Sequence, residues 1–443
     1  MQRGAMLLPL VLVLLLAPPA SAWEWREDWS WERLQTLTWG TNSSCCPYNG
    51  TNSRCCSLIE NATELAHKAT FDVIFQDNDL NMEGCRVPEM LPNGSFAPRP
   101  GSGGMDPLAT CLEARSAAAG RIKAAAPTKA VLDYRGIVIA WWDYTTADHA
   151  AWWLKGDTPG STAQVGVLDW RNKDAADYFV EKVVGLSTAT DPHIDGIFVD
   201  SGFGIAAGNP NMTYASRVAL QLAELQAFHR ICSMMAAHGK VVTVSLKSHF
   251  STILDQQGMA LCPAGMSPSN TSRCMPYGEE KIFEVLGSTR AFIPHRQFNI
   301  PSRDFGDAAH GGSDERGCVV AVLNLQQEAQ RGPTLITNND GGEYSSPSSK
   351  TGKMIDWWKA HNTSLAAFLM GMERQSFFGS GMHWADDGWN TAWPIFGKKL
   401  GAPEGPARLS TAADGSQVFS RSFAHLQVSL NCSGEMSSSF EWR

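Results

Sequence analysis

The chain has 443 residues, and its 44 acidic and 36 basic side chains give a formal net charge of -8 at pH 7. The length exceeds that of an average domain and suits one barrel with insertions plus a small accessory domain. The acidic balance argues against nucleic acid or an anionic membrane as a partner, although plain solubility explains the same charge.

The first 22 residues have the order of a secretory signal peptide. Arg3 precedes the apolar run Met6–Leu16, and small residues ending at Ala22 offer a cleavage site. The run is short of the roughly 20 residues needed to span a bilayer, so we expect cleavage after Ala22, with an uncleaved anchor as the alternative. No later stretch reaches spanning length without charges. We therefore expect no membrane partner after cleavage and a secreted, extracellular or secretory-lumen location, or a lytic compartment.

Cysteine and asparagine usage fit an oxidising compartment. The chain has 11 cysteines, and we expect disulfides at the adjacent pairs Cys45-Cys46 and Cys55-Cys56 and across the loop between Cys262 and Cys274. Cys85 and Cys111 are a further candidate pair, and the connectivity stays open. A metal site is the alternative for the adjacent pairs, but their spacing lacks the intervening residues of a zinc knuckle, so no metal is predicted. Eight Asn-x-Ser/Thr motifs predict N-glycosylation at Asn42, Asn49, Asn61, Asn93, Asn211, Asn270, Asn362 and Asn431.

Short β-rich runs alternate with longer helical patterns along the chain. The predicted strands are Leu34–Trp39, Phe71–Phe75, Ala130–Tyr134, Gly196–Asp200, Val241–Leu246, Arg290–Phe298, Pro333–Thr337 and Ser376–Gly379. The predicted helices are Leu58–Ala69, Ala109–Ala126, Asp174–Leu186, Tyr214–His238, Val319–Gln330 and Met354–Arg374. This order predicts an α/β fold with a parallel sheet closed into a TIM-type (β/α) barrel. A doubly wound open sheet is the alternative, but no G-x-G-x-x-G fingerprint follows any strand.

The tail from Phe396 changes character. Glycines and prolines precede the alternating run Gln417–Phe423 and a second run, His425–Leu430. Such short strands around turns predict a small antiparallel β domain at the C-terminus. The expected organisation is a signal peptide at 1–22, the catalytic barrel at 23–395 and the β unit at 396–443.

Carboxylates at the ends of apolar runs are the first candidates for chemistry, because barrel enzymes place reacting groups at the C-terminal ends of strands. Asp200 ends the run Gly196–Asp200 and is followed by small residues that would let a ligand approach. A cap or turn is the alternative role. Upstream, Asp169, Arg171 and Asn172 form a polar cluster that could cap the next helix or bind substrate. Arg171 could pair with Asp169 or Asp200, or hold a sugar hydroxyl.

At these motifs the sequence resembles the glycosyl hydrolases of the TIM-barrel glycosidase superfamily. It is similar, more distantly, to the endo-α-1,4-polygalactosaminidase and α-galactosidase-like groups. The motifs are D-W-R-N at 169–172, I-D-G-I-F-V-D-S-G at 194–202, F-G-K-K-L-G-A-P-E-G-P-A at 396–407 and V-F-S-R-S-F at 418–423. The resemblance implies that the carboxylate at the end of the fourth strand, Asp200, is catalytic. The second catalytic carboxylate of the family has no match in this sequence, because the sixth predicted strand contains neither Asp nor Glu.

Glycoside cleavage needs a second carboxyl group, and several strand ends offer one. Asp340, in a polar loop after the seventh predicted strand, is the candidate acid, with an Asp-Gly turn as the alternative. Further candidates are Asp77, Asp79, Asp133 and Asp143, and Asp77 after the second strand is also a candidate substrate ligand.

Aromatic residues are a second group of candidates for substrate binding. The chain has 16 tryptophans, and indole faces suit the C–H faces of sugar rings, although core packing accounts for many of them. The residues expected to bind substrate are Asp77, Trp141, Trp142, Asp169, Arg171, His249 and Trp384.

These residues predict a secreted glycoside hydrolase that acts on a polysaccharide or glycoconjugate by a two-carboxylate mechanism. Nothing in the sequence requires a cofactor. A catalytically inactive carbohydrate-binding protein on the same barrel is the main alternative, and a secreted structural glycoprotein is a third.

Overall fold

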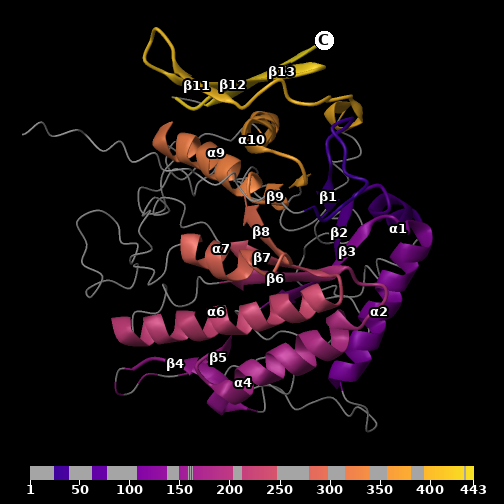
Figure 1. Ribbon diagram of the computed structural model, residues 1–443, viewed down its shortest axis with the longest axis vertical. Coiled ribbons are helices and arrows are strands. Elements are labelled where there is room, and N and C mark those ends of the chain that lie inside the picture. Colours follow the sequence, from indigo (N-terminus) through magenta and orange to yellow (C-terminus); the bar gives the residue numbers. More distant parts are fainter. Residues whose placement is uncertain are drawn as a thin grey trace, which may run out of the picture.

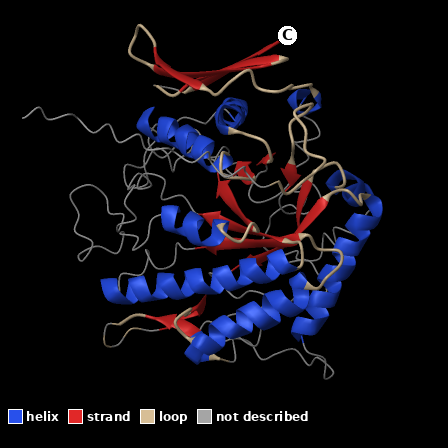
Figure 2. Cartoon of the chain, in the orientation of Figure 1, coloured by secondary structure: helices blue, strands red, loops and turns tan. Residues whose placement is uncertain are grey.

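A computed structural model describes 24–38, 62–76, 107–136, 149–157, 159, 161, 163–202, 212–246, 279–297, 315–338, 357–380, 394–433 and 436–443. Its main body is an eight-stranded parallel sheet surrounded by helices, as Figures 1 and 2 show. The strands, in both chain and spatial order, are β1 (Leu37–Thr38), β2 (Val73–Gln76), β3 (Ala130–Gly136), β6 (Gly196–Gly202), β7 (Val241–Leu246), β8 (Phe292–Gln297), β9 (Thr334–Asn338) and β10 (Ser376–Ser380).

The last strand returns to the first, which closes the sheet. A parallel bridge joins Thr36 to Phe378, and the Phe378 N–H donates to the Gln35 carbonyl at 3.0 Å. The fold is therefore a TIM-type barrel, and the eight predicted strands and the predicted fold class are confirmed.

The helices cover the outside of the barrel. They are α1 (Ala62–Lys68), α2 (Pro107–Ala125), α4 (Lys173–Asp177) with the π-helix η2 (Tyr178–Ala189), α6 (Tyr214–Ala237), α7 (Glu279–Gly287), α9 (Glu315–Ala329) and α10 (Trp357–Gly371). Asn172 and Thr213 cap α4 and α6, since their side-chain oxygens accept backbone N–H groups of the first turn. In the described part of the chain, no helix has the length and apolarity needed to cross a membrane.

Three features were not predicted. The helix α7 was missed, and the predicted helix Asp174–Leu186 is mostly π-helical. The antiparallel hairpin of β4 (Trp153–Lys155) and β5 (Ala163–Leu168) was also missed. Period-based patterns distinguish helix from strand but carry no signal for the wider π turn.

In each barrel strand, successive side chains point alternately into the barrel and toward the surrounding helices. In β2, Val73 and Phe75 belong to the central core, whereas Ile74 packs with Ala119 and Ile122 of α2. Both faces are buried, which is why these strands read as continuous apolar runs.

A four-stranded antiparallel sheet, formed by β11 (Arg408–Thr411), β12 (Gln417–Phe423), β13 (Leu426–Asn431) and β14 (Ser437–Trp442), packs over α9 and α10 (Figure 1). This confirms the predicted C-terminal β unit. Phe419 and Leu430 on its inner face belong to the same hydrophobic cluster as Phe368 of α10 and Phe378 of the barrel. A domain boundary at residue 396 remains a prediction, and the hydrophobic core runs across it.

Arg421 of β12 fixes this sheet to the barrel. Its guanidinium is buried and donates to the carbonyls of Leu369, Met370 and Met372, at 3.1, 3.3 and 2.5 Å. Nη2 also lies 2.9 Å from Glu373 Oε1. A cation thus satisfies the last carbonyls of α10, where the helix dipole is negative. The V-F-S-R-S-F motif, which supported the resemblance, has this structural role at Arg421.

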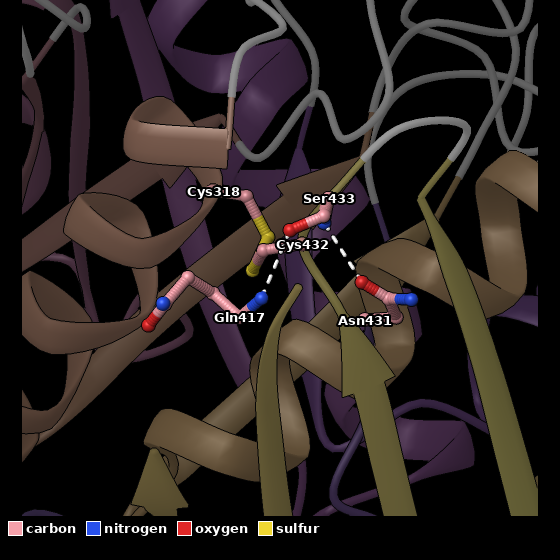
Figure 3. Close-up of a disulfide and its surroundings, with 5 residues drawn as sticks. All are labelled: Cys318, Gln417, Asn431, Cys432 and Ser433. Carbon is pink, nitrogen blue, oxygen red and sulfur yellow. Dashed lines mark hydrogen bonds between the residues drawn. A yellow bond between two sulfur atoms is a disulfide. The ribbon is translucent and has the colours of Figure 1, made fainter. Parts of the chain in front are cut away.

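The disulfide Cys318–Cys432 is a second link between the two parts (Figure 3). Cys318 lies in α9, Cys432 follows β13, and both are fully buried. No spacing rule pointed to this pair, because 114 positions separate the two cysteines in the sequence. Cys232 is free and buried. The predicted disulfide cysteines Cys45, Cys46, Cys55, Cys56, Cys262 and Cys274 lie outside the described residues.

Replacing Arg421 with methionine should lower the free energy of unfolding by about 3 kcal/mol, because two carbonyls in the last turn of α10, the Met372 carbonyl just after it and Glu373 lose a buried cationic donor. Urea unfolding followed by circular dichroism measures the change. Arg408→Met on the exposed strand β11 is the matched control and should shift stability by less than about 0.5 kcal/mol. Equal shifts in the two variants would contradict the proposed cap.

His361 in α10 should make the protein less stable in acid. Burial lowers the pKa of its imidazole to about 3, whereas an unfolded histidine titrates near 6.5. Below about pH 6.5 the unfolded chain therefore binds a proton that the folded chain does not, and stability falls until the pH reaches about 3. The loss between pH 7 and pH 5 should be about 2 kcal/mol. His361→Gln should remove this loss in unfolding curves at the two pH values. The same substitution at exposed His229 controls for removing an imidazole, and an unchanged loss in His361→Gln would refute the prediction.

Candidate functional site

The candidate site is the end of the barrel where the strands terminate. Barrel enzymes build their sites there, from strand ends and the loops that follow. Asp200 lies near the end of β6, the fourth barrel strand, with its backbone in register with Gly136 of β3. It stands two positions beyond Phe198, which is a side chain of the barrel interior.

Below this end, one half of the barrel interior is aromatic. The rings of Phe75 in β2 and Phe198 in β6 stack with centroids 4.7 Å apart, and Tyr134 in β3 lies 5.5 Å from Phe198. Strand β3 separates β2 from β6, so a contact between Phe75 and Phe198 must cross the interior. Tyr134 is partly exposed, whereas both phenylalanines are buried.

The other half of this layer is polar. His295 of β8 is fully buried, with its ring 4.9 Å from Phe198 and edge-on to it. Its Nε2 lies 2.9 Å from Thr337 Oγ1 of β9. Ser245 of β7 is in register with His295 and fully buried, and its Oγ has no hydrogen-bond partner in the described part of the chain. The interior therefore presents rings on one side and hydrogen-bonding groups on the other.

His295 was not among the residues predicted for the site, because the sixth strand contains no Asp or Glu that could act as a second carboxylate. Strand alternation puts His295 on the same side as Ile293, but apolar residues occupy both sides of this strand, so the sequence does not show which side faces inward.

The D-W-R-N segment forms a capped turn after β5. Asp169 Oδ1 accepts from Arg171 Nε at 2.8 Å, and Oδ2 accepts from Nη2 at 2.7 Å. Hydrogen bonds to Asp169 raise the pKa of Arg171, since they favour its charged form. Of the pairings predicted for Arg171, the one with Asp169 is present. A substrate role for Asp169 and Arg171 remains a prediction.

Asp157 extends this cluster to the start of α6. Its Oδ2 accepts from the Thr213 N–H at 2.7 Å and from Thr213 Oγ1 at 2.8 Å, and its Oδ1 lies 3.7 Å from Arg171 Nη1. The hairpin β4–β5 is thereby tied to the first turns of both α4 and α6.

Asp133 is removed from the candidate second carboxylates. It is fully buried on the outer side of β3, where Oδ1 accepts from Arg115 Nε at 2.6 Å and Oδ2 lies 2.6 Å from Arg135 Nη2. Thr188 at the end of η2 also donates to Oδ2, at 3.2 Å. The alternation of the strand turns this carboxylate toward the helices, so the prediction of Asp133 as a candidate second carboxylate was wrong.

The remaining predicted site residues, Asp77, Trp141, Trp142, His249, Asp340 and Trp384, lie outside the described residues, as do Asp79 and Asp143. Among the described residues, no group of three or more His, Cys, Asp or Glu side chains could hold a metal ion. Two predicted glycosylation sites fall in the described part. Asn362 is partly buried in α10, and Asn431 ends β13. The other six, Asn42, Asn49, Asn61, Asn93, Asn211 and Asn270, lie outside it.

Two substitutions in the polar half should have opposite effects on stability. Thr337→Val keeps the shape but removes the hydroxyl next to His295, so it should cost about 1 kcal/mol. Ser245→Ala removes a buried hydroxyl that has no partner in the described residues, so stability should stay constant or rise by up to about 1 kcal/mol. Thermal unfolding of both variants measures this. A loss in Ser245→Ala as large as in Thr337→Val would mean that the serine hydroxyl is bonded in the native protein.

The sequence matches no protein-family model and no curated protein. Among solved structures, an α-amylase from Lactobacillus plantarum is similar with a TM-score of 0.44 and 11% identity, over 91% of this chain and 88% of that one. A chitinase from Pseudoalteromonas aurantia has a TM-score of 0.36 and 11% identity, over 81% of this chain and 98% of that one. The carboxyl transferase domain of pyruvate carboxylase from Rhizobium etli has a TM-score of 0.37 and 9% identity, over 79% of this chain and 40% of that one. The names of these three proteins cover different chemistries.

Proposed function

We propose that this protein is a glycoside hydrolase acting on a polysaccharide or glycoconjugate. The observation that carries the proposal is the position of Asp200 near the C-terminal end of the fourth strand of a closed barrel. That end is where barrel enzymes place their reacting groups. The family that the sequence resembles also carries a catalytic carboxylate at the end of this strand.

In the proposed mechanism two carboxyl groups act on the glycosidic bond. Asp200 is the nucleophile or the base, and Asp340, two positions beyond the end of β9, is the acid that protonates the leaving oxygen. In a retaining enzyme Asp200 would attack the anomeric carbon, whereas in an inverting enzyme it would take a proton from the attacking water.

The chemistry of the side chains in the barrel interior supports the proposal of a sugar ligand above them. Rings from β2, β3 and β6 face hydrogen-bonding groups from β8 and β9, and a pyranose likewise combines apolar C–H faces with hydroxyl edges. Tyr134 is the partly exposed ring of this layer, so it is our candidate for direct contact with substrate. We propose Asp77, Trp141, Trp142, Asp169, Arg171, His249 and Trp384 as further substrate-binding residues.

We also propose that the protein is secreted, with the first 22 residues removed. Disulfides persist mainly in oxidising compartments, and Cys318–Cys432 is buried in the hydrophobic core rather than poised at the surface. The N-glycosylation motifs fit the same location.

A carbohydrate-binding protein without catalysis is the second candidate. The observation that favours it is the sixth barrel strand, β8, whose inward position near the site carries His295 and no carboxylate. The imidazole is buried between Phe198 and Thr337, which suits a structural or ligand-orienting role.

Replacing Asp200 with asparagine should reduce hydrolysis at least about a thousandfold, because the isosteric amide can neither attack nor accept the proton. Release of reducing ends from a panel of polysaccharides measures the effect. Asp195→Asn is the matched control, since Asp195 lies immediately before the other end of the same strand. Its Oδ2 accepts from the Val131 N–H at 2.7 Å, so that variant should lose stability but keep activity.

The outcomes separate the two candidates. Equal activity in wild type and Asp200→Asn would remove Asp200 from the mechanism. Sugar binding by the wild type, measured by calorimetry, with no release from any polysaccharide would favour the binding protein. For Asp340→Asn, loss on natural linkages but not on glycosides with an activated aryl leaving group would identify the acid, because such leaving groups need no protonation.

A further inference from the structure

The glycosylation motif at Asn431 contains one of the two cysteines of the disulfide that links the C-terminal sheet to α9. The motif consists of Asn431, Cys432 and Ser433, and its middle residue is the partner of Cys318 (Figure 3). Among the eight motifs in the sequence, this is the only one whose middle residue is cysteine. The candidate acceptor asparagine and a disulfide-bonded cysteine are therefore adjacent in the chain.

The folded sheet immobilises all three residues of the motif. Asn431 pairs with Val418 of β12 and with Ser437 of β14, so the motif begins on a central strand. The Cys432 N–H donates to the Gln417 carbonyl at 2.9 Å, and the Gln417 N–H donates to Ser433 Oγ, also at 2.9 Å. A transferase would have to bind this backbone and the serine hydroxyl in its own cleft, and both are already engaged.

The same structure leaves room for a glycan that is already attached. The Ser433 N–H donates to Asn431 Oδ1 at 2.8 Å, so this bond uses the oxygen and not the nitrogen of the amide. Figure 3 shows the amide nitrogen on the side turned away from Ser433 and Cys432. Asn431 is partly exposed, as are Val418 and Ser429 beside it on the outer face of the sheet. A glycan on Nδ2 would therefore extend outward without breaking the bond to Oδ1.

We propose that Asn431 can receive a glycan only before the C-terminal sheet closes and the Cys318–Cys432 disulfide forms. In the transfer, Asn431 Nδ2 bonds to the anomeric carbon of a lipid-diphosphate-linked oligosaccharide, the lipid diphosphate leaves, and Nδ2 loses a proton. In the closure, two thiols lose two protons and two electrons to the disulfide of a thiol oxidoreductase, which becomes a dithiol. The first step needs a mobile motif, and the second immobilises it, so the order is fixed.

The decisive experiment uses the full-length mature protein, made without glycans and fully oxidised. This protein is incubated with membranes that contain oligosaccharyltransferase and its lipid-linked donor, beside a sample that was reduced and alkylated. Mass spectrometry of the peptide spanning 431–433 gives the occupancy. We expect at least tenfold more modification of Asn431 in the reduced sample. Equal modification of the two samples would overturn the proposal.

Variants expressed in a secreting cell test the same order during synthesis. Cys318→Ala leaves the motif intact but prevents closure, so occupancy at Asn431 should rise above the wild-type level. Cys232→Ala is the matched control, since Cys232 is equally buried but free, and it should leave the occupancy unchanged. Equal occupancy in Cys318→Ala and wild type would count against the proposal.

A final measurement tests whether the fold tolerates the glycan. Non-reducing digestion of the secreted wild type should yield peptides that carry both the Cys318–Cys432 bond and a glycan on Asn431. Glycan found only on molecules without that bond would overturn the claim that the closed sheet accommodates it.

Discussion

Closure of the parallel sheet is the constraint on which the rest of the structure depends. The hydrogen bond from the Phe378 N–H to the Gln35 carbonyl brings β10 back to β1. Every strand then acquires an inner and an outer side, and all eight strand ends meet at one end of the barrel. The same alternation that places His295 inside places Asp133 outside, paired with Arg115 and Arg135. These charged side chains thereby lie between the sheet and its helices, whereas the interior layer around His295 combines aromatic rings with hydrogen-bonding groups.

The second organising element is α10, which lies between the barrel and the C-terminal sheet (Figure 1). Its end is held by Arg421, and the neighbouring helix α9 is cross-linked through Cys318 to Cys432. A helix that is buried nearly all round cannot rely on solvent to satisfy its last carbonyls, so a cation from the sheet does this instead. The C-terminal sheet therefore packs as part of the barrel, and substitutions in the sheet should also alter the packing of β9 and β10.

The proposed chemistry depends on a division of roles within the barrel. The side chains of Phe75, Phe198 and His295 form a rigid layer below the strand ends, because their rings pack against one another across the interior. Above it, Asp200 continues β6 toward the strand ends. A site built on strands holds its groups more precisely than one built on loops alone, and glycoside cleavage demands a defined separation of two carboxyl groups. The cluster of Asp157, Arg171 and Thr213 adds a fixed point at the rim of the same end.

The sequence by itself determined the barrel and the C-terminal sheet, because buried parallel strands are continuous apolar runs and paired antiparallel strands alternate. It also placed Asp200 at a strand end, since an apolar run that stops at a carboxylate is visible without neighbours. Only the tertiary structure decided that Asp133 faces the helices, that His295 lies inside and that Cys318 meets Cys432. These depend on which side of a strand faces inward, and on contacts across 114 positions of chain. Local patterns carry neither kind of information, because closure and packing fix both.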